Sequence, residues 1–112
     1  MRKLVTAIAL LSATPSAFAC AELEHASPRV GAVIPASPRE IALDMSEKLD
    51  PKGAEIVIDG RKDAASLVQV AGRRMSARVS QPLRPGVHRV LWSVYSQDGH
   101  IAAGDYQFVV KP

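Results

Sequence analysis

A short run near the C-terminus places a carboxylate and an imidazole within three residues of each other. A strand-like alternation breaks at Asp98, Gly99 and His100 and then resumes. Because glycine tolerates positive φ, Gly99 allows a tight turn that presents both flanking side chains towards one point. Carboxylate oxygen and imidazole nitrogen are donors suited to a divalent transition metal, and His25 adds a third such donor near the expected start of the mature chain. We therefore expect His25, Asp98 and His100 to form a metal site.

Each of these residues taken alone has a simpler interpretation. An Asp-Gly pair is most often an ordinary hairpin turn, and a single histidine near a chain start is usually just solvated. The metal hypothesis depends on the combination of Asp98, His100 and His25. His88 is excluded from it, because its even spacing with Val90 predicts a packed position on a sheet face.

The elements that position these residues begin after an export signal. Arg2 and Lys3 precede the apolar run of residues 4–11, and small residues follow, which together form the three-part pattern of a secretory signal. The apolar run is far shorter than the roughly 20 residues that a membrane-spanning helix needs, so no membrane span is expected. We assign residues 1–21 to the signal and residues 22–112 to one small domain.

Two cleavage points compete at the end of this signal. Cleavage after Ala19 would leave Cys20 as the first residue, whereas cleavage after Ala21 would leave Glu22 first and remove the only cysteine. We favour the second, because a single unpaired thiol is unusual in an exported protein. A lipid-anchored Cys20 is the less favoured alternative.

The charge of the chain gives little support for a nucleic-acid partner. The formal net charge of +3 falls to +1 when Arg2 and Lys3 leave with the signal. The basic doublets at residues 61–62 and 73–74 are not interleaved with aromatic side chains, as a nucleic-acid surface would require. We expect both doublets to lie on solvated turns.

The rest of the chain alternates apolar and polar residues with a period of two, which is typical of strands. Turn residues separate the runs at short intervals, so an antiparallel sandwich or barrel is expected, and seven strands suit a two-sheet sandwich. Helix should be limited to single turns, such as one at Leu49 to Lys52. The expected strands cover residues 30–34, 39–45, 54–59, 66–70, 74–79, 86–96 and 104–111.

Two stretches resemble the signatures of the CopC family of periplasmic copper-resistance proteins. They are H-A-S-P-R-V-G-A-V-I-P-A-S-P-R-E-I-A-L-D-M-S-E-K-L from His25 and L-R-P-G-V-H-R-V-L-W-S-V-Y-S-Q-D-G-H from Leu83. The resemblance spans essentially the whole mature chain. It implies an all-β, seven-stranded antiparallel Greek-key β-sandwich, immunoglobulin-like or cupredoxin-like, that binds Cu(II) in the periplasm. It further implies a carrier or buffer in copper homeostasis and resistance, with a periplasmic or inner-membrane copper-transport partner.

The family's Cu(II) ligands match His25, Asp98 and His100, and a family glutamate near the metal matches Glu47, which we interpret as an outer partner that orients a ligand. In the best-known family members the histidine is the first residue after processing, so its terminal amine also binds copper. Here further residues precede His25, so water, Glu24 or a backbone atom is expected to fill the fourth position, with weaker binding.

The methionine content predicts a single-site Cu(II) protein. Soft thioether ligands favour Cu(I), but this chain lacks the methionine-rich loop of some relatives. After the signal only Met45 and Met75 remain, each at a strand position where a core role is expected. We therefore expect no dedicated Cu(I) site.

Two other functions stay open. One is an immunoglobulin-like interaction module without metal, and the other is a copper-dependent oxidative enzyme. No serine or cysteine nucleophile with a matched base stands out, and the terminal amine of copper mono-oxygenases is missing, so we expect no enzymatic activity.

Overall fold

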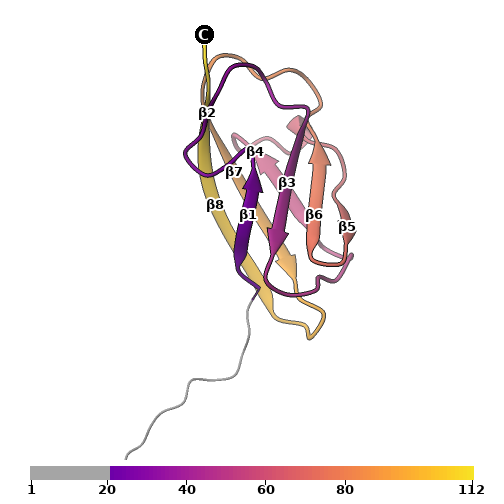
Figure 1. Ribbon diagram of the computed structural model, residues 1–112. Coiled ribbons are helices and arrows are strands. Elements are labelled where there is room, and N and C mark those ends of the chain that lie inside the picture. Colours follow the sequence, from indigo (N-terminus) through magenta and orange to yellow (C-terminus); the bar gives the residue numbers. More distant parts are fainter. Residues whose placement is uncertain (1–20) are drawn as a thin grey trace, which may run out of the picture.

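Two four-stranded sheets pack face to face in the computed structural model, which describes residues 21–112 (Figure 1). The first sheet has the order β1 (Leu23–Ser27), β3 (Glu40–Met45), β6 (Arg74–Arg78) and β5 (Gln69–Ala71). The second has the order β2 (Val33–Ile34), β8 (Ile101–Val110), β7 (Gly86–Tyr95) and β4 (Glu55–Ile58). The predicted all-β sandwich is confirmed. Apart from Ala21, the predicted signal lies outside the described residues.

The strand count differs from the prediction, because β1 was not expected. This strand pairs antiparallel with β3, and its register shifts between Leu23 and His25. An extra residue in a strand breaks the alternation by which strands are recognised, so this sequence did not look like one. The described chain therefore has eight strands rather than seven, and His25 lies in a strand rather than in a loose chain start.

Smaller differences concern pairing and boundaries. The short β2 pairs parallel with β8, so the sandwich is not wholly antiparallel. β8 begins at Ile101, three residues earlier than expected. Among the described residues the only helical segment is a 3₁₀ turn at Lys62–Ala64, whereas Leu49, where a helical turn was expected, forms a β-bridge with Ser96.

The core lies between the two sheets and is filled by every second residue of the longer strands. Met45 and Met75 are 1% and 0% exposed, which confirms the core role predicted for both. Burial of a large aliphatic or aromatic side chain contributes about 1.5–3 kcal/mol, so these alternating residues hold the sheets together. The largest contributions come from Ile41, Leu43, Ile58, Val90, Trp92, Val94, Tyr106 and Phe108.

The β7–β8 hairpin is the longest paired element and carries the predicted metal turn. Its ten cross-strand pairs run from Gly86 opposite Val110 to Tyr95 opposite Ile101. The turn therefore lies at one end of a long, well-supported arm, at the lower end of the molecule in Figure 1. Within the described chain, no helix has the length and apolarity to cross a bilayer.

Candidate metal centre

The turn between β7 and β8 is closed by backbone hydrogen bonds. The Ser96 N–H donates to the His100 carbonyl at 2.9 Å, and the Gly99 N–H donates to the Ser96 carbonyl at 2.9 Å. Gly99 has φ of +92°, the positive value that the sequence predicted. In this conformation Asp98 Oδ1 lies 3.3 Å from His100 Nδ1, so the turn brings these two side chains together.

The turn is also fixed to the segment that follows β3. Leu49 and Ser96 form a β-bridge, and the Gln97 N–H donates to the Lys48 carbonyl at 3.0 Å. The Asp50 N–H donates to the Tyr95 carbonyl at 2.8 Å. These contacts join the two sheets at this end, so the turn is held in place by the segment that follows β3.

The carboxylate and the imidazole are both accessible. Their side chains are 57% and 43% exposed, and Nδ1 of His100 is buried. Asp98 Oδ1 accepts a hydrogen bond from the Ser96 hydroxyl. This bond is the main reason why the pKa of Asp98 is lowered; burial opposes it, and His100 lowers the pKa further. Asp98 is therefore ionised at neutral pH and is available to a cation.

His25 has a different environment from the other two predicted ligands. It is exposed on β1 and is the cross-strand neighbour of Asp44 on β3. Asp44 is held by Arg74, with Nε to Oδ1 at 2.8 Å and Nη2 to Oδ2 at 3.3 Å. The Arg74 hydrogen bond is the main reason why the pKa of Asp44 is lowered; burial opposes it, and the charges of Arg74 and His25 add to the lowering.

The three predicted ligands are therefore only partly brought together. β1, the strand that carries His25, begins at the same end of the sandwich as the β7–β8 turn (Figure 1). However, among residues 21–112 no three His, Cys, Asp or Glu side chains are gathered closely enough to hold a metal ion. The structure pairs Asp98 with His100 and places His25 beside Asp44.

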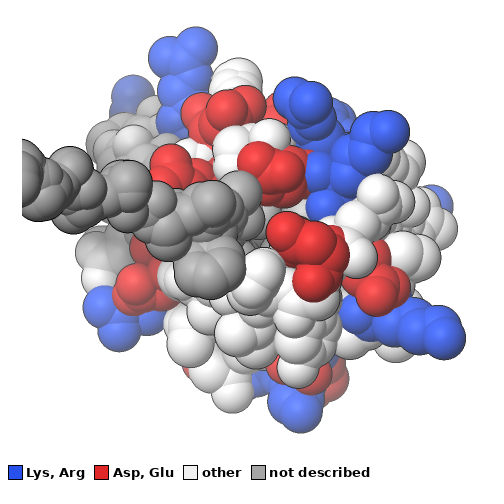
Figure 2. Space-filling view, turned by 90° about the horizontal axis from the view of Figure 1, so that it is seen from below, with Lys and Arg blue, Asp and Glu red and all other residues white. Residues whose placement is uncertain are grey.

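A hollow of about 280 Å³ adjoins the turn. It is lined by Glu47, Lys48, Arg73, Ser96, Gln97 and Asp98, so Glu47 lies beside the predicted metal donors. Figure 2 looks at this end of the molecule and shows acidic side chains across its described part, with basic side chains mostly towards the margin. Such a surface attracts a cation without carrying a uniform negative field.

His88 is a structural residue, as predicted. It is 8% exposed, and its Nδ1 lies 2.6 Å from Asp59 Oδ2, while its Nε2 lies 2.7 Å from the Arg84 carbonyl oxygen. Its ring also packs against Phe108, with the ring centroids 5.7 Å apart. Both nitrogens are engaged, so neither is available to a metal.

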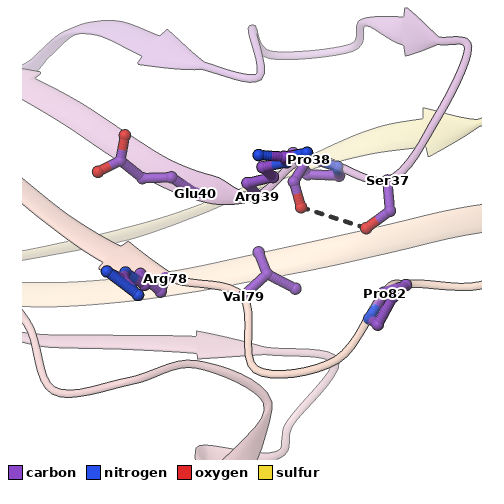
Figure 3. A pocket seen from close by; sticks show the side chains of 7 residues that line it. All are labelled: Ser37, Pro38, Arg39, Glu40, Arg78, Val79 and Pro82. Atoms are coloured by element: carbon purple, nitrogen blue, oxygen red, sulfur yellow. Dashed lines mark hydrogen bonds between the residues drawn. The ribbon is translucent and has the colours of Figure 1, made fainter.

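Another hollow, of about 600 Å³, is formed where β3 begins and β6 ends (Figure 3). None of the predicted metal donors lines it. Its lining mixes charged, polar and apolar residues, and Ser37 and Pro38 lie at one side of it, away from Glu40. Because β3 and β7 both run from this end of the sandwich towards the turn, this hollow is remote from the predicted metal donors. It is lined by Ser37, Pro38, Arg39, Glu40, Arg78, Val79 and Pro82.

The sequence interpretation overlooked Ser96. Ser96 is the last residue of the strand expected over residues 86–96, and no role was predicted for it, yet it is 2% exposed and donates a hydrogen bond to Asp98. A serine hydroxyl often bonds to a polar group two residues further along the chain, so the Ser-x-Asp spacing was a usable signal.

Fold and turn together define a β-sandwich protein with an ionised carboxylate and an imidazole exposed on one hairpin turn. A family model described as the CopC domain matches residues 23–111. The chain therefore belongs to the CopC family, which confirms the resemblance inferred from its sequence.

Relatives and a solved structure agree with this membership. Protein YobA of Escherichia coli K12 is 34% identical, with 98% of this chain and 96% of the relative covered. Copper resistance protein C of Escherichia coli is 33% identical, with 86% of this chain and 85% of the relative covered. The crystal structure of CopC from Methylosinus trichosporium OB3b has a TM-score of 0.75 and 28% identity, covering 82% of this chain and 94% of that one. These similarities associate the chain with copper resistance and with copper binding.

Proposed function

We propose that this protein is a periplasmic Cu(II)-binding protein that carries or buffers copper in copper homeostasis and resistance. The observation that supports this most is the pairing of Asp98 with His100 on an exposed, anchored turn of a CopC-family chain. Cu(II) favours arrangements of imidazole nitrogen and carboxylate oxygen, and it stands highest in the affinity order of the divalent metals. The residues present therefore fit a cupric ion.

In this proposal Asp98 supplies a carboxylate oxygen and His100 supplies an imidazole nitrogen. His25 supplies the third donor, which rests on the family resemblance rather than on a contact with the turn. The buried sulfurs of Met45 and Met75 are withheld from the surface, which favours Cu(II) over Cu(I) as the bound state.

The export signal supports a periplasmic location and its own removal, and the resemblance supports a membrane or periplasmic copper-transport partner. We propose no catalytic role. Copper transfer requires reversible binding on an accessible surface, and the exposed turn provides that surface.

The proposal is tested by titrating Cu(II) into the purified, processed protein against a competing chelator. We expect one equivalent to bind to the wild type. Loss of an outer partner of a metal site typically weakens affinity about 10- to 100-fold, so loss of a direct ligand should weaken it at least about 100-fold. Asp98→Ala, His100→Ala and His25→Ala should each show this loss.

Asp105→Ala is the matched control. Asp105 is an exposed carboxylate on β8 that is paired with Arg89 at 3.2 Å, away from the turn. Its variant should bind copper as the wild type does. Undiminished binding by both Asp98→Ala and His100→Ala would overturn the proposed site, whereas undiminished binding by His25→Ala alone would remove only His25 from it.

A further inference from the structure

Ser96 occupies a fixed position at the base of the metal turn. It is 2% exposed and forms a β-bridge with Leu49. Its N–H donates to the His100 carbonyl at 2.9 Å, and its carbonyl accepts from the Gly99 N–H at 2.9 Å. Because the backbone is held on both sides, the direction of the Ser96 side chain is set by the fold rather than by the turn alone.

The Ser96 hydroxyl has two acceptors within reach. One is Asp98 Oδ1, and the other is the His100 carbonyl oxygen at 3.2 Å. A hydroxyl carries a single hydrogen, and an ionised carboxylate is the stronger acceptor. The hydrogen is therefore directed to Asp98, and one oxygen of this carboxylate is fixed by a buried donor.

We propose that Ser96 is a positioning residue of the copper site, whose hydroxyl holds Oδ1 of Asp98 and leaves Oδ2 as the copper donor. This inference rests on the proposed function. An exposed aspartate on a turn otherwise samples several staggered rotamers, and ordering it costs free energy when a ligand binds. Ser96 reduces that cost before copper arrives, because its hydroxyl, together with His100 Nδ1 at 3.3 Å from the same oxygen, already orients the carboxylate in the metal-free protein.

The first test uses the metal-free protein. Three-bond couplings to the Asp98 β-protons, measured by NMR, report how many χ1 rotamers the side chain samples. We expect one dominant rotamer in the wild type and in Ser96→Thr, which keeps the hydroxyl, but averaging in Ser96→Ala. A single rotamer retained in Ser96→Ala would overturn the inference.

The second test measures Cu(II) affinity by chelator competition and the electron paramagnetic resonance spectrum of the bound ion. Ser96→Ala should lose about 10- to 100-fold in affinity and show a broadened or shifted spectrum, and Ser96→Thr should recover most of the affinity. Ser93→Ala is the control, because Ser93 is a half-buried serine of β7 paired with Ala103, before the turn. It should bind copper unchanged.

A purely structural serine would give a different result. In that case Ser96→Ala would lower the melting temperature but leave the Asp98 couplings, copper affinity and copper spectrum unchanged, and the inference would be wrong. If the extra methyl group of Ser96→Thr prevents folding, the copper affinities and Asp98 couplings of Ser96→Ala and Ser93→Ala still distinguish a positioning role from a purely structural one. Absence of copper binding in the wild type would overturn the proposed function. The Asp98 couplings of the metal-free protein would still test whether Ser96 orients this carboxylate.

Discussion

The three histidines of this chain have three different environments. His25 is exposed on β1 beside Asp44, His100 is partly exposed on the β7–β8 turn beside Asp98, and His88 is buried between two acceptors. A histidine can ligate a metal only through a nitrogen that is free of other bonds and reachable from solvent. By this criterion His88 is structural, and His25 and His100 are the two histidines that reach the surface.

His88 should make the stability of the protein depend on pH. A carbonyl and a carboxylate only accept hydrogen bonds, so the imidazolium with two N–H groups satisfies both partners. Burial, the largest single influence, lowers the pKa of His88, but the bonds to Arg84 and Asp59 and the Asp59 charge together raise it. The stabilisation is therefore complete below about pH 6.5 and is lost as the pH rises through the raised folded pKa.

His88→Gln should remove this dependence and lower the free energy of unfolding at pH 6 by about 1.5–3 kcal/mol, the contribution of a hydrogen bond to a charged group. Urea unfolding between pH 6 and 9, followed by Trp92 fluorescence, measures both effects. If the free energies of unfolding of wild type and variant differed by the same amount at every pH in this range, the assignment of a charged His88 would be contradicted.

At the scale of elements, the β7–β8 hairpin depends on a close approach of one side chain to the opposite strand. Trp92 lies opposite Gly104, and a Cβ at Gly104 would lie 2.7 Å from Cζ2 of the indole. The missing side chain allows the indole to pack close against β8 and remain 7% exposed. The position of the metal turn thus depends on packing that begins several residues away from it.

Gly104→Ala should lower the free energy of unfolding by about 1–3 kcal/mol, because the added methyl group overpacks the indole. Trp92→Phe should relieve this penalty, since the smaller ring leaves space. A double-mutant cycle in denaturant would measure the coupling. Additive effects of the two substitutions would show that the contact is not the cause.

The start of β1 bears on where the signal is cleaved. Ala21 is 4% exposed and belongs to the core. Two hydrogen bonds of 2.8 Å join the next residue to Ser46: the Glu22 N–H donates to Ser46 Oγ, and the Ser46 N–H donates to the Glu22 carbonyl. Cleavage after Ala21 would remove a core residue. The burial of Ala21 favours the alternative point after Ala19, which leaves Cys20 first. Intact mass of the exported protein decides between them, and a mass that begins at Glu22 would refute this revision.

At the scale of the whole molecule, the turn joins the two sheets, so copper bound there should stabilise the entire domain. A ligand present at about 100 times its dissociation constant stabilises the folded state by about 2.7 kcal/mol, which corresponds to a rise of roughly 10–20 °C in melting temperature for a domain of this size. Calorimetry with and without an excess of Cu(II) measures the rise in melting temperature. A metal-free interaction module would show none.

This rise should shrink as the solution is made acid, because both proposed imidazole ligands must be deprotonated to bind copper. The Asp98→Ala/His100→Ala double variant should show no rise at any pH. A rise that survives in this variant would place copper elsewhere on the molecule.

Sequence reasoning was most successful where periodicity was long and regular. The alternation from Val90 to Val94 predicted β7, and the Asp98-Gly99-His100 break predicted the turn and its positive φ, because such signals are local in the chain. It failed at β1, where a register shift interrupts the alternation, and at Ser96, where a strand position concealed a hydrogen-bonding role.

The sequence by itself determined the sandwich, its family and the proximity of Asp98 and His100, because side-chain periodicity and turn chemistry act over a few neighbouring residues. Only the tertiary structure decided that His25 lies on an edge strand beside Asp44 and that both nitrogens of His88 are engaged. These facts depend on strand register between segments far apart in the chain, and register is set by packing of the whole core rather than by local propensity.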